Sequence, residues 1–308
     1  MIIYIDIDET ICYHSDHNTK VARDYNLASP ILKNIEKAND LYDAGHTIVY
    51  WTARGAVSGI DRTGSMISKV SVIIPCYNAE KFILKTLTSV LEQQYKNIEI
   101  IAVDNESQDK TYEILHKLSK DHKNIKIDQA KNIYPFCWDE ARSKGLEIST
   151  GDYITTLCSD DYFEKDYIKN CVQIMDKLKN KISLFQSPIR GVDTNGYEIN
   201  RVGHQYANLE EFKSTAVNKC PVTSPTVFYK RELYDKGLIK TDPEKYSGAA
   251  DYDLYCNLAD QGYFLLPVPN WLGYNYRWHD DQATWGMHKS KVNYDSLIQS
   301  FWRKKWKL

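Results

Sequence analysis

From residue 70 onward, short apolar runs alternate with longer segments in which apolar residues recur every three or four positions. Such runs are typical of buried strands, and the periodic segments are typical of helices with one apolar face. The predicted strands lie near residues 70–75, 97–103, 124–128 and 152–157, and the predicted helices lie near 79–93, 109–121, 137–148 and 164–180. Strands that alternate with helices favour a mainly parallel sheet covered by helices.

The pattern is less regular after residue 181. Apolar segments at Ile182–Pro188 and Thr226–Tyr229 predict two further strands, and a periodic segment near Asp251–Gln261 predicts a helix. We interpret this part as the side of the domain that contacts a second substrate.

The first 61 residues form a separate pattern of strand, helix and strand. The strands are predicted at Ile2–Ile7 and His46–Trp51, and the helix at Pro30–Ala44. Glycines then interrupt the pattern before it starts again. The prediction is therefore an N-terminal segment with a linker over residues 1–65 and a larger domain over residues 66–308.

Composition narrows the class of protein. The 308 residues are 43% apolar and carry a formal net charge of -2, so the chain can bury a core and has no overall basic field of the kind that binds nucleic acid. Seven scattered cysteines without a metal-binding spacing favour a reducing compartment. No apolar stretch approaches 18 residues and no leader precedes the first strand, so we expect a cytoplasmic protein.

Polar side chains follow three of the predicted strands. Pro75, Tyr77 and Asn78 follow the first strand, Asp104 ends the second, and Cys158-Ser159-Asp160-Asp161 follows the fourth. The carboxyl ends of parallel strands gather at one edge of an open α/β sheet, where nucleotides bind. The sequence therefore predicts a nucleotide site at this edge.

These three segments together resemble the family 2 glycosyltransferases, which have the GT-A fold. The resemblance covers about residues 68–285 and implies an α/β domain with a Rossmann-like mixed sheet and a nucleotide-sugar donor. It implies that Asp104 accepts a hydrogen bond from uracil and that Pro75, Tyr77 and Asn78 surround the base and ribose. The alternative for Asp104 and Asn78 is a structural role, capping a turn or the helix that begins near Ala79.

The resemblance also implies a metal. Asp160 matches the carboxylate that binds Mg²⁺ or Mn²⁺, cations that prefer oxygen ligands. Ser159 would contact the nucleotide, whereas Cys158 replaces an aspartate that contacts ribose in the family. His279, in Tyr-Arg-Trp-His, matches a family histidine that binds the metal or the diphosphate.

Two further segments complete the predicted site. Arg142, in Ala-Arg-Ser-Lys-Gly, matches a family arginine that would reach the nucleotide. Asp251, in Gly-Ala-Ala-Asp-Tyr-Asp-Leu, matches the family's general base, which removes the proton of the acceptor hydroxyl. Asp253 is the alternative base, and both aspartates could instead stabilise a helix N-terminus.

The N-terminal segment resembles part of another family, the haloacid dehalogenase-like phosphatases. That resemblance would make Asp6 a nucleophile, Asp8 an acid/base and Thr52 a phosphate ligand. The lysine and the later acidic pair of those enzymes do not follow, so we interpret residues 1–65 as a partial, vestigial phosphatase α/β segment without activity.

The C-terminal residues 301–308 mix tryptophan with lysine and arginine. Such a tail fits either peripheral contact with the inner face of the cytoplasmic membrane or a helix packed on the domain.

The function predicted from the sequence is metal-dependent, inverting transfer of a sugar from a UDP-sugar donor to a hydroxyl acceptor. The family resemblance points to a glycan or lipid-linked glycan of a bacterial surface polysaccharide, such as capsule or lipopolysaccharide. Two alternatives stay open at this point, a sugar-phosphate phosphatase completed by another chain and a UDP-binding module without catalysis.

Overall fold

The computed structural model describes residues 2–6, 12–13, 29–30, 40, 47–51, 67–134, 137–178 and 180–308. The chain divides into two compact units, Met1–Ile67 and Ser68–Leu308, and each is described by itself.

The N-terminal unit contains two pairs of short strands. β1 (Ile2–Asp6) pairs with β4 (Thr47–Trp51) in parallel, with Ile2 opposite Thr47. β2 (Cys12–Tyr13) pairs with β3 (Ser29–Pro30) in antiparallel. The two predicted strands are thus present, but Pro30 lies in β3 and not at the start of a helix. Asp8 and Thr52 lie outside the described residues, and Asp6 is the last residue of β1.

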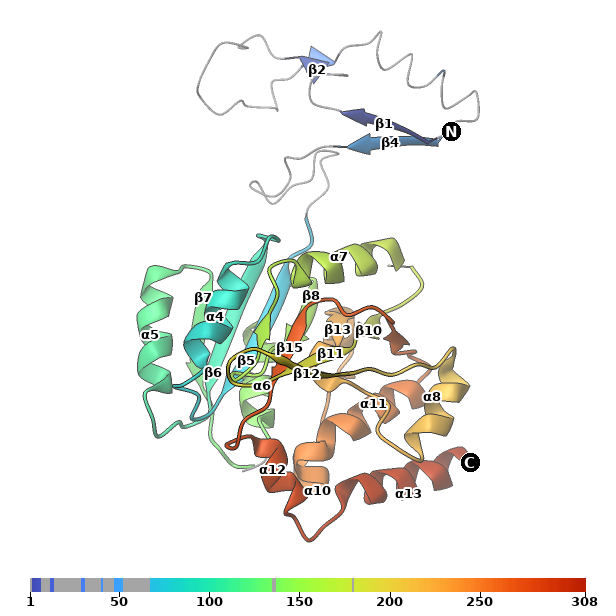
Figure 1. Ribbon diagram of the computed structural model, residues 1–308. Coiled ribbons are helices and arrows are strands. Elements are labelled where there is room, and N and C mark those ends of the chain that lie inside the picture. Colours follow the sequence, from blue (N-terminus) through green and yellow to red (C-terminus); the bar gives the residue numbers. More distant parts are fainter. Residues whose placement is uncertain are drawn as a thin grey trace. The chain divides into compact units, whose positions relative to one another are not determined.

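The second unit is built on a seven-stranded sheet in the order β14-β10-β13-β8-β5-β6-β7 (Figure 1). Its strands are β5 (Val70–Cys76), β6 (Ile98–Asp104), β7 (Ile125–Gln129), β8 (Tyr153–Thr156), β10 (Leu184–Gln186), β13 (Phe228–Lys230) and β14 (Leu266–Pro267). β8, β5, β6 and β7 are parallel neighbours, whereas β13 is antiparallel to β8 and to β10. The mixed sheet expected from the sequence is therefore present.

Helices follow most of these strands. Their bounds are α4 (Ile83–Leu91), α5 (Thr111–Asp121), α6 (Asp139–Ile148), α7 (Tyr167–Leu178), α8 (Leu209–Ala216), α9 (Glu232–Asp235), α10 (Pro243–Tyr246), α11 (Ala250–Asp260), α12 (Ala283–His288) and α13 (Tyr294–Trp306). The predicted helices agree with α4, α5, α6, α7 and α11 to within a few residues, as the periodicity of their apolar positions requires.

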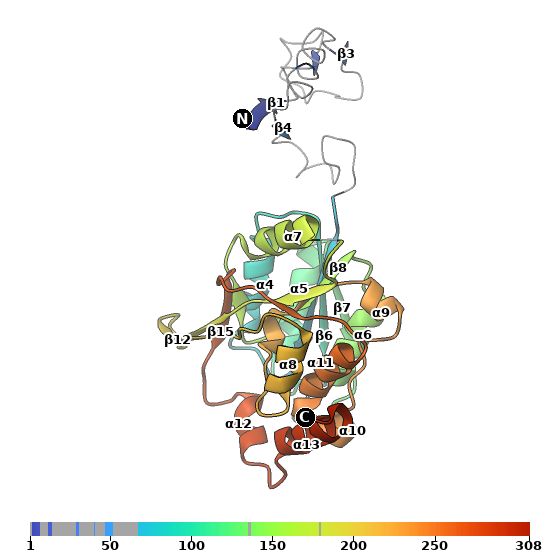
Figure 2. The ribbon, with the colours of Figure 1, turned by 90° about the vertical axis from the view of Figure 1, so that its right-hand side faces the viewer.

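Both faces of the central strands are covered, which explains their continuous apolar sequence. From β5, Val72 and Ile74 pack with residues of α4, α5 and α7, whereas Ile73 packs with residues of α6 and α11 on the opposite face. Figure 2 shows α4 and α6 on opposite sides of the strands. Gly145 of α6 permits this packing, because a Cβ atom there would lie 2.5 Å from Cγ2 of Ile73.

The second unit also contains a smaller, four-stranded sheet. It has the order β12-β11-β15-β9, with β9 (Tyr162–Phe163), β11 (Ile189–Val192), β12 (Glu198–Val202) and β15 (Tyr274–Arg277). β9 and β15 pair in antiparallel, with Tyr162 opposite Asn275. This pairing brings residues near 277 to residues near 161, which are far apart in the chain.

The C-terminal tail packs on the domain as helix α13. Trp302 is fully buried, and its indole Nε1 donates a hydrogen bond to Oδ1 of Asp253 over 2.7 Å. Trp306 donates to Asp260 over 2.9 Å. Within the part of the chain that the structure describes, no helix has the length and apolar character needed to cross a membrane. Packing on the domain therefore accounts for the two tryptophans of the tail.

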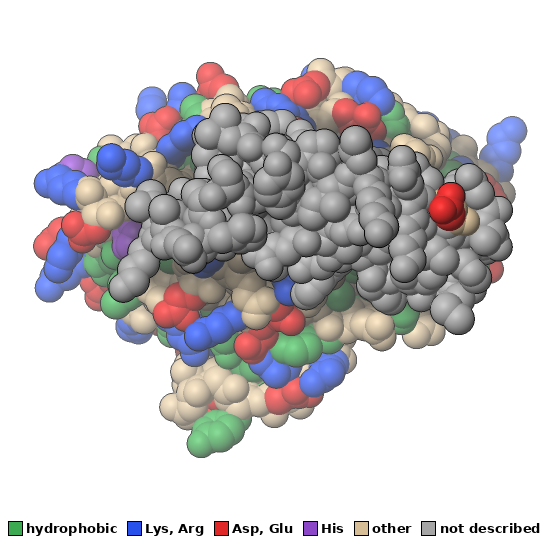
Figure 3. All heavy atoms as spheres, turned by 90° about the horizontal axis from the view of Figure 1, so that it is seen from above, with side chains coloured by type: hydrophobic (Ala, Val, Ile, Leu, Met, Phe, Trp, Pro, Cys, Tyr) green, Lys and Arg blue, Asp and Glu red, His purple; other side chains and the backbone are tan. Residues whose placement is uncertain are grey.

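Charged side chains of both signs are interspersed over the visible described surface in Figure 3. The lysine and arginine side chains on this face alternate with aspartate and glutamate rather than gathering into a basic field. This mixture agrees with the small net charge of the sequence.

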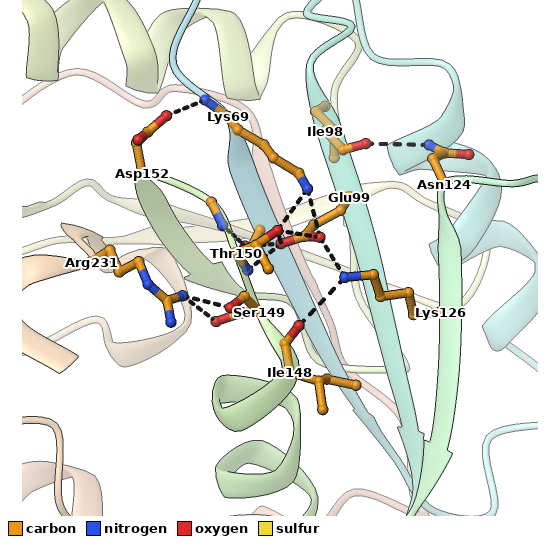
Figure 4. A network of polar contacts seen from close by, with 12 residues as sticks. Lys69, Ile98, Glu99, Asn124, Lys126, Ile148, Ser149, Thr150, Asp152 and Arg231 are labelled. Carbon is orange, nitrogen blue, oxygen red and sulfur yellow. Dashed lines mark hydrogen bonds and ion pairs between the residues drawn. The ribbon is translucent and has the colours of Figure 1, made fainter. Parts of the chain in front are cut away.

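A buried carboxylate joins the amino ends of four parallel strands, β5, β6, β7 and β8 (Figure 4). Glu99 of β6 is 3% exposed and accepts hydrogen bonds from Ser71 and from the backbone N–H of Thr150, both over 2.6 Å. Lys69 and Lys126 lie 2.8 Å and 2.9 Å from its Oε2 atom. Burial alone would raise the pKa of Glu99, but the contacts with these four residues lower it to about 2.

We expect Glu99→Gln to lower the free energy of unfolding by about 2 kcal/mol at pH 7. A carboxyl group whose pKa is lower in the folded state stabilises the fold above its unfolded pKa, and this stability is lost as pH falls toward 2. Urea unfolding at pH 7 and at pH 3 measures the effect, with the exposed Glu113→Gln as control. The difference between Glu99→Gln and wild type should shrink at pH 3, and an equal difference at both pH values would contradict a charge effect.

Candidate functional site

The carboxyl ends of β5, β6 and β8 lie side by side, as the sequence predicted. Cys76 is opposite Asp104 in the β5–β6 register, and Ile73 is opposite Thr156 in the β5–β8 register. The backbone N–H of Asn105 also donates to the carbonyl of Cys76 over 2.7 Å. The residues that follow these strands are therefore brought to one edge of the sheet.

The turns after β5 and β6 are tied together by hydrogen bonds. Asn78 adopts a left-handed conformation with φ of 47°, its N–H donates to Ser107, and its Oδ1 accepts from the N–H of Gln108 over 2.8 Å. The N-cap of α4 is Phe82, so the prediction that Asn78 caps this helix is wrong. Tyr77, which precedes Asn78, is 46% exposed.

Asp104 lies at the bottom of this edge and is 1% exposed. Its Oδ2 atom accepts a hydrogen bond from the N–H of Ser107 over 3.2 Å, which is the turn-capping role. Its Oδ1 atom and Oδ1 of Asn105 are buried and have no hydrogen-bond partner among the described residues. Buried acceptors without partners are rare and costly, so they mark a place where a ligand donor fits.

Asp160 and His279 face each other after β8 and β15. The Oδ2 atom of Asp160 lies 3.0 Å from Nε2 of His279. Nδ1 of His279 is buried without a partner in the described part of the chain. The ligand atoms of Cys158, Asp160 and Asp161 lie within 4.8 Å of one another. The Asp160 carboxylate is a ligand that suits Mn²⁺ or Mg²⁺, and the nitrogen of His279 is accepted more readily by Mn²⁺ than by Mg²⁺. Burial raises the pKa of the Cys158 thiol, and sulfur is a poor ligand for such hard cations.

Asp161 holds the loop in place. It is fully buried, and its carboxylate accepts hydrogen bonds from the hydroxyl of Tyr274 over 2.7 Å and from the N–H of Arg277 over 2.8 Å. Burial, and then the charge of Asp160, raise the pKa of Asp161. Thr86 of α4 donates to the carbonyls of Ser159 and Asp161. The loop is thus fixed by α4 on one side and β15 on the other.

Asp251 lies in the first turn of α11. Its Oδ1 atom accepts a hydrogen bond from the N–H of Tyr252 over 2.7 Å, and burial raises its pKa above the ordinary value. Asp253 differs, because both its carboxylate oxygens are used, by Trp302 over 2.7 Å and Asn257 over 2.9 Å. Asp253 is therefore a structural residue, and Asp251 is the carboxylate of this pair that lines a pocket.

Arg142 of α6 lines the same pocket. Its Nη2 atom lies 3.0 Å from Oγ1 of Thr241 and 3.3 Å from Oδ1 of Asp139, and Thr241 also donates to Asp139. Neither Asp139 nor Thr241 was identified from the sequence. Asp139 opens a helix and Thr241 lies about 100 residues later in a loop, so no local pattern connects them.

The pocket joins these parts. It lies between α6, β8, β13 and α11, and its wall includes Trp138, Arg142, Cys158, Tyr229 and Asp251. Asp251 and Cys158 both line this pocket, so the predicted base and the loop of residues 158–161 lie next to the same cavity. Tyr229 is a further pocket residue that the sequence did not single out, because it resembles any core tyrosine of a buried strand.

The chain matches known families and structures over this region. The model of glycosyl transferase family 2 matches residues 71–238. The UDP-Glc:α-D-GlcNAc-diphosphoundecaprenol β-1,3-glucosyltransferase WfaP of Escherichia coli is 30% identical over 237 residues, which cover 75% of this chain and 86% of WfaP. An uncharacterized glycosyltransferase of Rickettsia felis is 31% identical over 194 residues, 63% of this chain and 31% of that protein. The chain thus spans about a third of that Rickettsia relative.

Among solved structures, TarS of S. aureus in complex with UDP-GlcNAc has a TM-score of 0.58 at 23% identity, covering 73% of this chain and 62% of TarS. This similarity confirms the predicted α/β fold of the second unit. The sequence prediction of a glycosyltransferase agrees with both the family model and WfaP. The chain therefore belongs to glycosyl transferase family 2.

Proposed function

We propose that residues 66–308 form a metal-dependent, inverting glycosyltransferase that uses a UDP-sugar donor. The observation that carries this proposal is the Asp160–His279 pair, 3.0 Å apart, at the carboxyl edge of the sheet. Asp160 lies on the same loop as Cys158, which lines a pocket together with Asp251. A metal-ligand pair beside a carboxylate base is the arrangement that sugar transfer from a nucleotide diphosphate needs.

Asp104 recognises the base in this proposal. Its unpaired Oδ1 atom is a buried acceptor and is suited to the N3–H donor of uracil. Pro75 lies inside β5, opposite Val103, and not after the strand as the sequence suggested, while exposed Tyr77 and left-handed Asn78 form the turn that follows. These three residues would surround the base and ribose, and Ser159 would contact the nucleotide from the metal loop.

Asp160 and His279 would hold Mn²⁺ or Mg²⁺. The unpaired Nδ1 atom and the exposed part of the Asp160 carboxylate, 26% of its side chain, support binding of a cation at this place. The bound ion would neutralise the charge that develops on the departing diphosphate. Asp161 positions this pair, because its carboxylate holds β15 through Tyr274 and Arg277.

Asp251 acts as the general base. It takes the proton of the acceptor hydroxyl while the oxygen forms a bond to the anomeric carbon. The bond between that carbon and the diphosphate oxygen breaks, and its electron pair leaves with UDP. Because the acceptor attacks from the face opposite the leaving group, the configuration at the anomeric carbon is inverted.

The relatives suggest the acceptor class. The name of WfaP specifies a sugar on diphosphoundecaprenol, and AmsB of Erwinia amylovora, 29% identical over 200 residues, is an amylovoran biosynthesis glycosyltransferase. We therefore propose a glycan or lipid-linked glycan of a bacterial surface polysaccharide, made at the inner face of the membrane. Exposed Phe301 and the basic residues of α13 could contact lipid there while Trp302 stays buried.

The proposal predicts metal-dependent release of UDP. A panel of UDP-sugars is incubated with the protein and Mn²⁺ or Mg²⁺, with and without EDTA, and free UDP is measured. We expect slow hydrolysis of at least one donor, faster with acceptor and abolished by EDTA, because the diphosphate is a poor leaving group without the cation. Release that continues in EDTA would contradict metal dependence, and failure to bind UDP in a parallel titration would contradict the proposed site.

A further inference from the structure

The pocket that Asp251 lines has both polar and apolar walls. Asp251, Cys158 and Ser224 lie at the polar part of the wall, whereas its remaining wall is mostly apolar. The apolar side chains come from four parts of the fold and are Leu184, Val227, Ile239, Leu254 and Leu258. A ligand group held in this pocket would therefore be largely removed from water and would contact mainly hydrocarbon.

One polar group inside the pocket lacks a partner. Tyr229 of β13 is 6% exposed, and its hydroxyl is buried without a hydrogen bond to any residue that the structure describes. The nearby polar groups of Arg142, Asp139 and Thr241 are paired with one another. A buried hydroxyl that finds no partner in the chain marks a position for a ligand acceptor or donor.

We propose that this pocket holds an acetamido group of the transferred sugar, so that the preferred donor is a UDP-N-acetylhexosamine. This inference rests on the proposed function. The methyl of an acetamido group suits the apolar wall, and its carbonyl accepts a hydrogen bond from Tyr229. A hydroxyl in the same place would leave the apolar wall unfilled, and a carboxylate would meet an arginine whose charge is already balanced by Asp139.

The position of the pocket indicates which carbon of the sugar carries the group. Asp251 must lie close to the acceptor hydroxyl that attacks the anomeric carbon, and it also lines the pocket. The substituent on C2 is the nearest to the anomeric carbon that can enter beside Asp251. This arrangement favours a 2-acetamido sugar over one that carries the group at a more distant carbon.

The test compares binding of UDP, UDP-GlcNAc and UDP-glucose in the presence of Mn²⁺, because the two donors differ at C2. We expect UDP-GlcNAc to bind wild type about tenfold to a hundredfold more tightly than UDP-glucose, the range for a buried hydrogen bond with its apolar contacts. Tyr229→Phe should reduce this preference about tenfold while leaving the affinity for UDP unchanged. Tyr263→Phe, a matched change outside the pocket, should leave both the donor preference and the affinity for UDP unchanged.

Each of the other outcomes would overturn one part of the proposal. Equal affinity for the two donors would overturn the acetamido pocket and leave the proposed function intact. A preference that survives Tyr229→Phe would overturn the role of that hydroxyl. If neither UDP nor either donor binds, the proposed function fails, and the pocket assignment fails with it.

Discussion

Asp160→Ala should reduce metal-dependent sugar transfer by a factor of about 10³ or more. The variant removes a carboxylate that lies 3.0 Å from Nε2 of His279, and with it the charge that would hold the cation in the proposed mechanism. Stabilisation of a departing diphosphate by a metal is worth several kcal/mol, and each 1.36 kcal/mol changes the rate tenfold. The measurement is UDP release from the preferred donor across a range of Mn²⁺ concentrations.

Controls separate loss of the metal from loss of the fold. Asp121→Ala, at the exposed end of α5, removes a surface carboxylate and should keep wild-type activity. Thermal unfolding of Asp160→Ala should remain close to that of wild type, because the side chain is partly exposed and its hydrogen bond within the described part of the chain is to His279. Full activity of the variant at low Mn²⁺ would show that another residue holds the ion.

Asp251→Asn should lower kcat by about 10²–10⁴, the range for a general base, with little change in the affinity for UDP. Asparagine keeps the shape and an oxygen for the N–H of Tyr252 but cannot take a proton. Wild-type kcat should also fall as pH is lowered through the pKa of Asp251, because only the ionised carboxylate is a base. Burial raises that pKa, so the loss should begin at a higher pH than for an ordinary aspartate.

Asp253→Asn provides a matched comparison two residues away. Asp253 accepts hydrogen bonds from Trp302 and Asn257. Its replacement should therefore lower the free energy of unfolding while kcat changes little. The opposite result, in which Asp253→Asn loses transfer and Asp251→Asn retains it, would reverse the assignment of the base. Steady-state kinetics with acceptor and urea unfolding of both variants make this distinction.

The strands of the second unit were predictable because each central strand is buried on both faces. β5 and β6 are buried along their length and mostly apolar, and the helices that cover them have one apolar face, so both periodicities are visible in the sequence. The small sheet was not predicted. β12 is exposed throughout and β9 has two residues, so neither carries a hydrophobic pattern.

The candidate site was predictable where a residue lies next to a strand end. Asp104 and Asp160 follow strands whose carboxyl ends must meet. The roles of side chains that meet across long distances were not predictable. Asp253 resembles Asp251 in the sequence but faces Trp302, and Arg142 bonds Thr241, a loop residue about 100 positions later. These choices depend on tertiary packing, which spacing along the chain does not encode.

The hydrogen bonds of Asp161 also set an order for biosynthesis. Asp161 is synthesised more than 110 residues before its partners Tyr274 and Arg277. A nascent chain that stops before β15 contains β5, β6 and β8 but lacks both donors to Asp161 and also lacks His279. A protein truncated in this interval would therefore lack the Asp160–His279 pair. Its loop of residues 158–161 would also lack the hydrogen bonds that hold it in the complete chain.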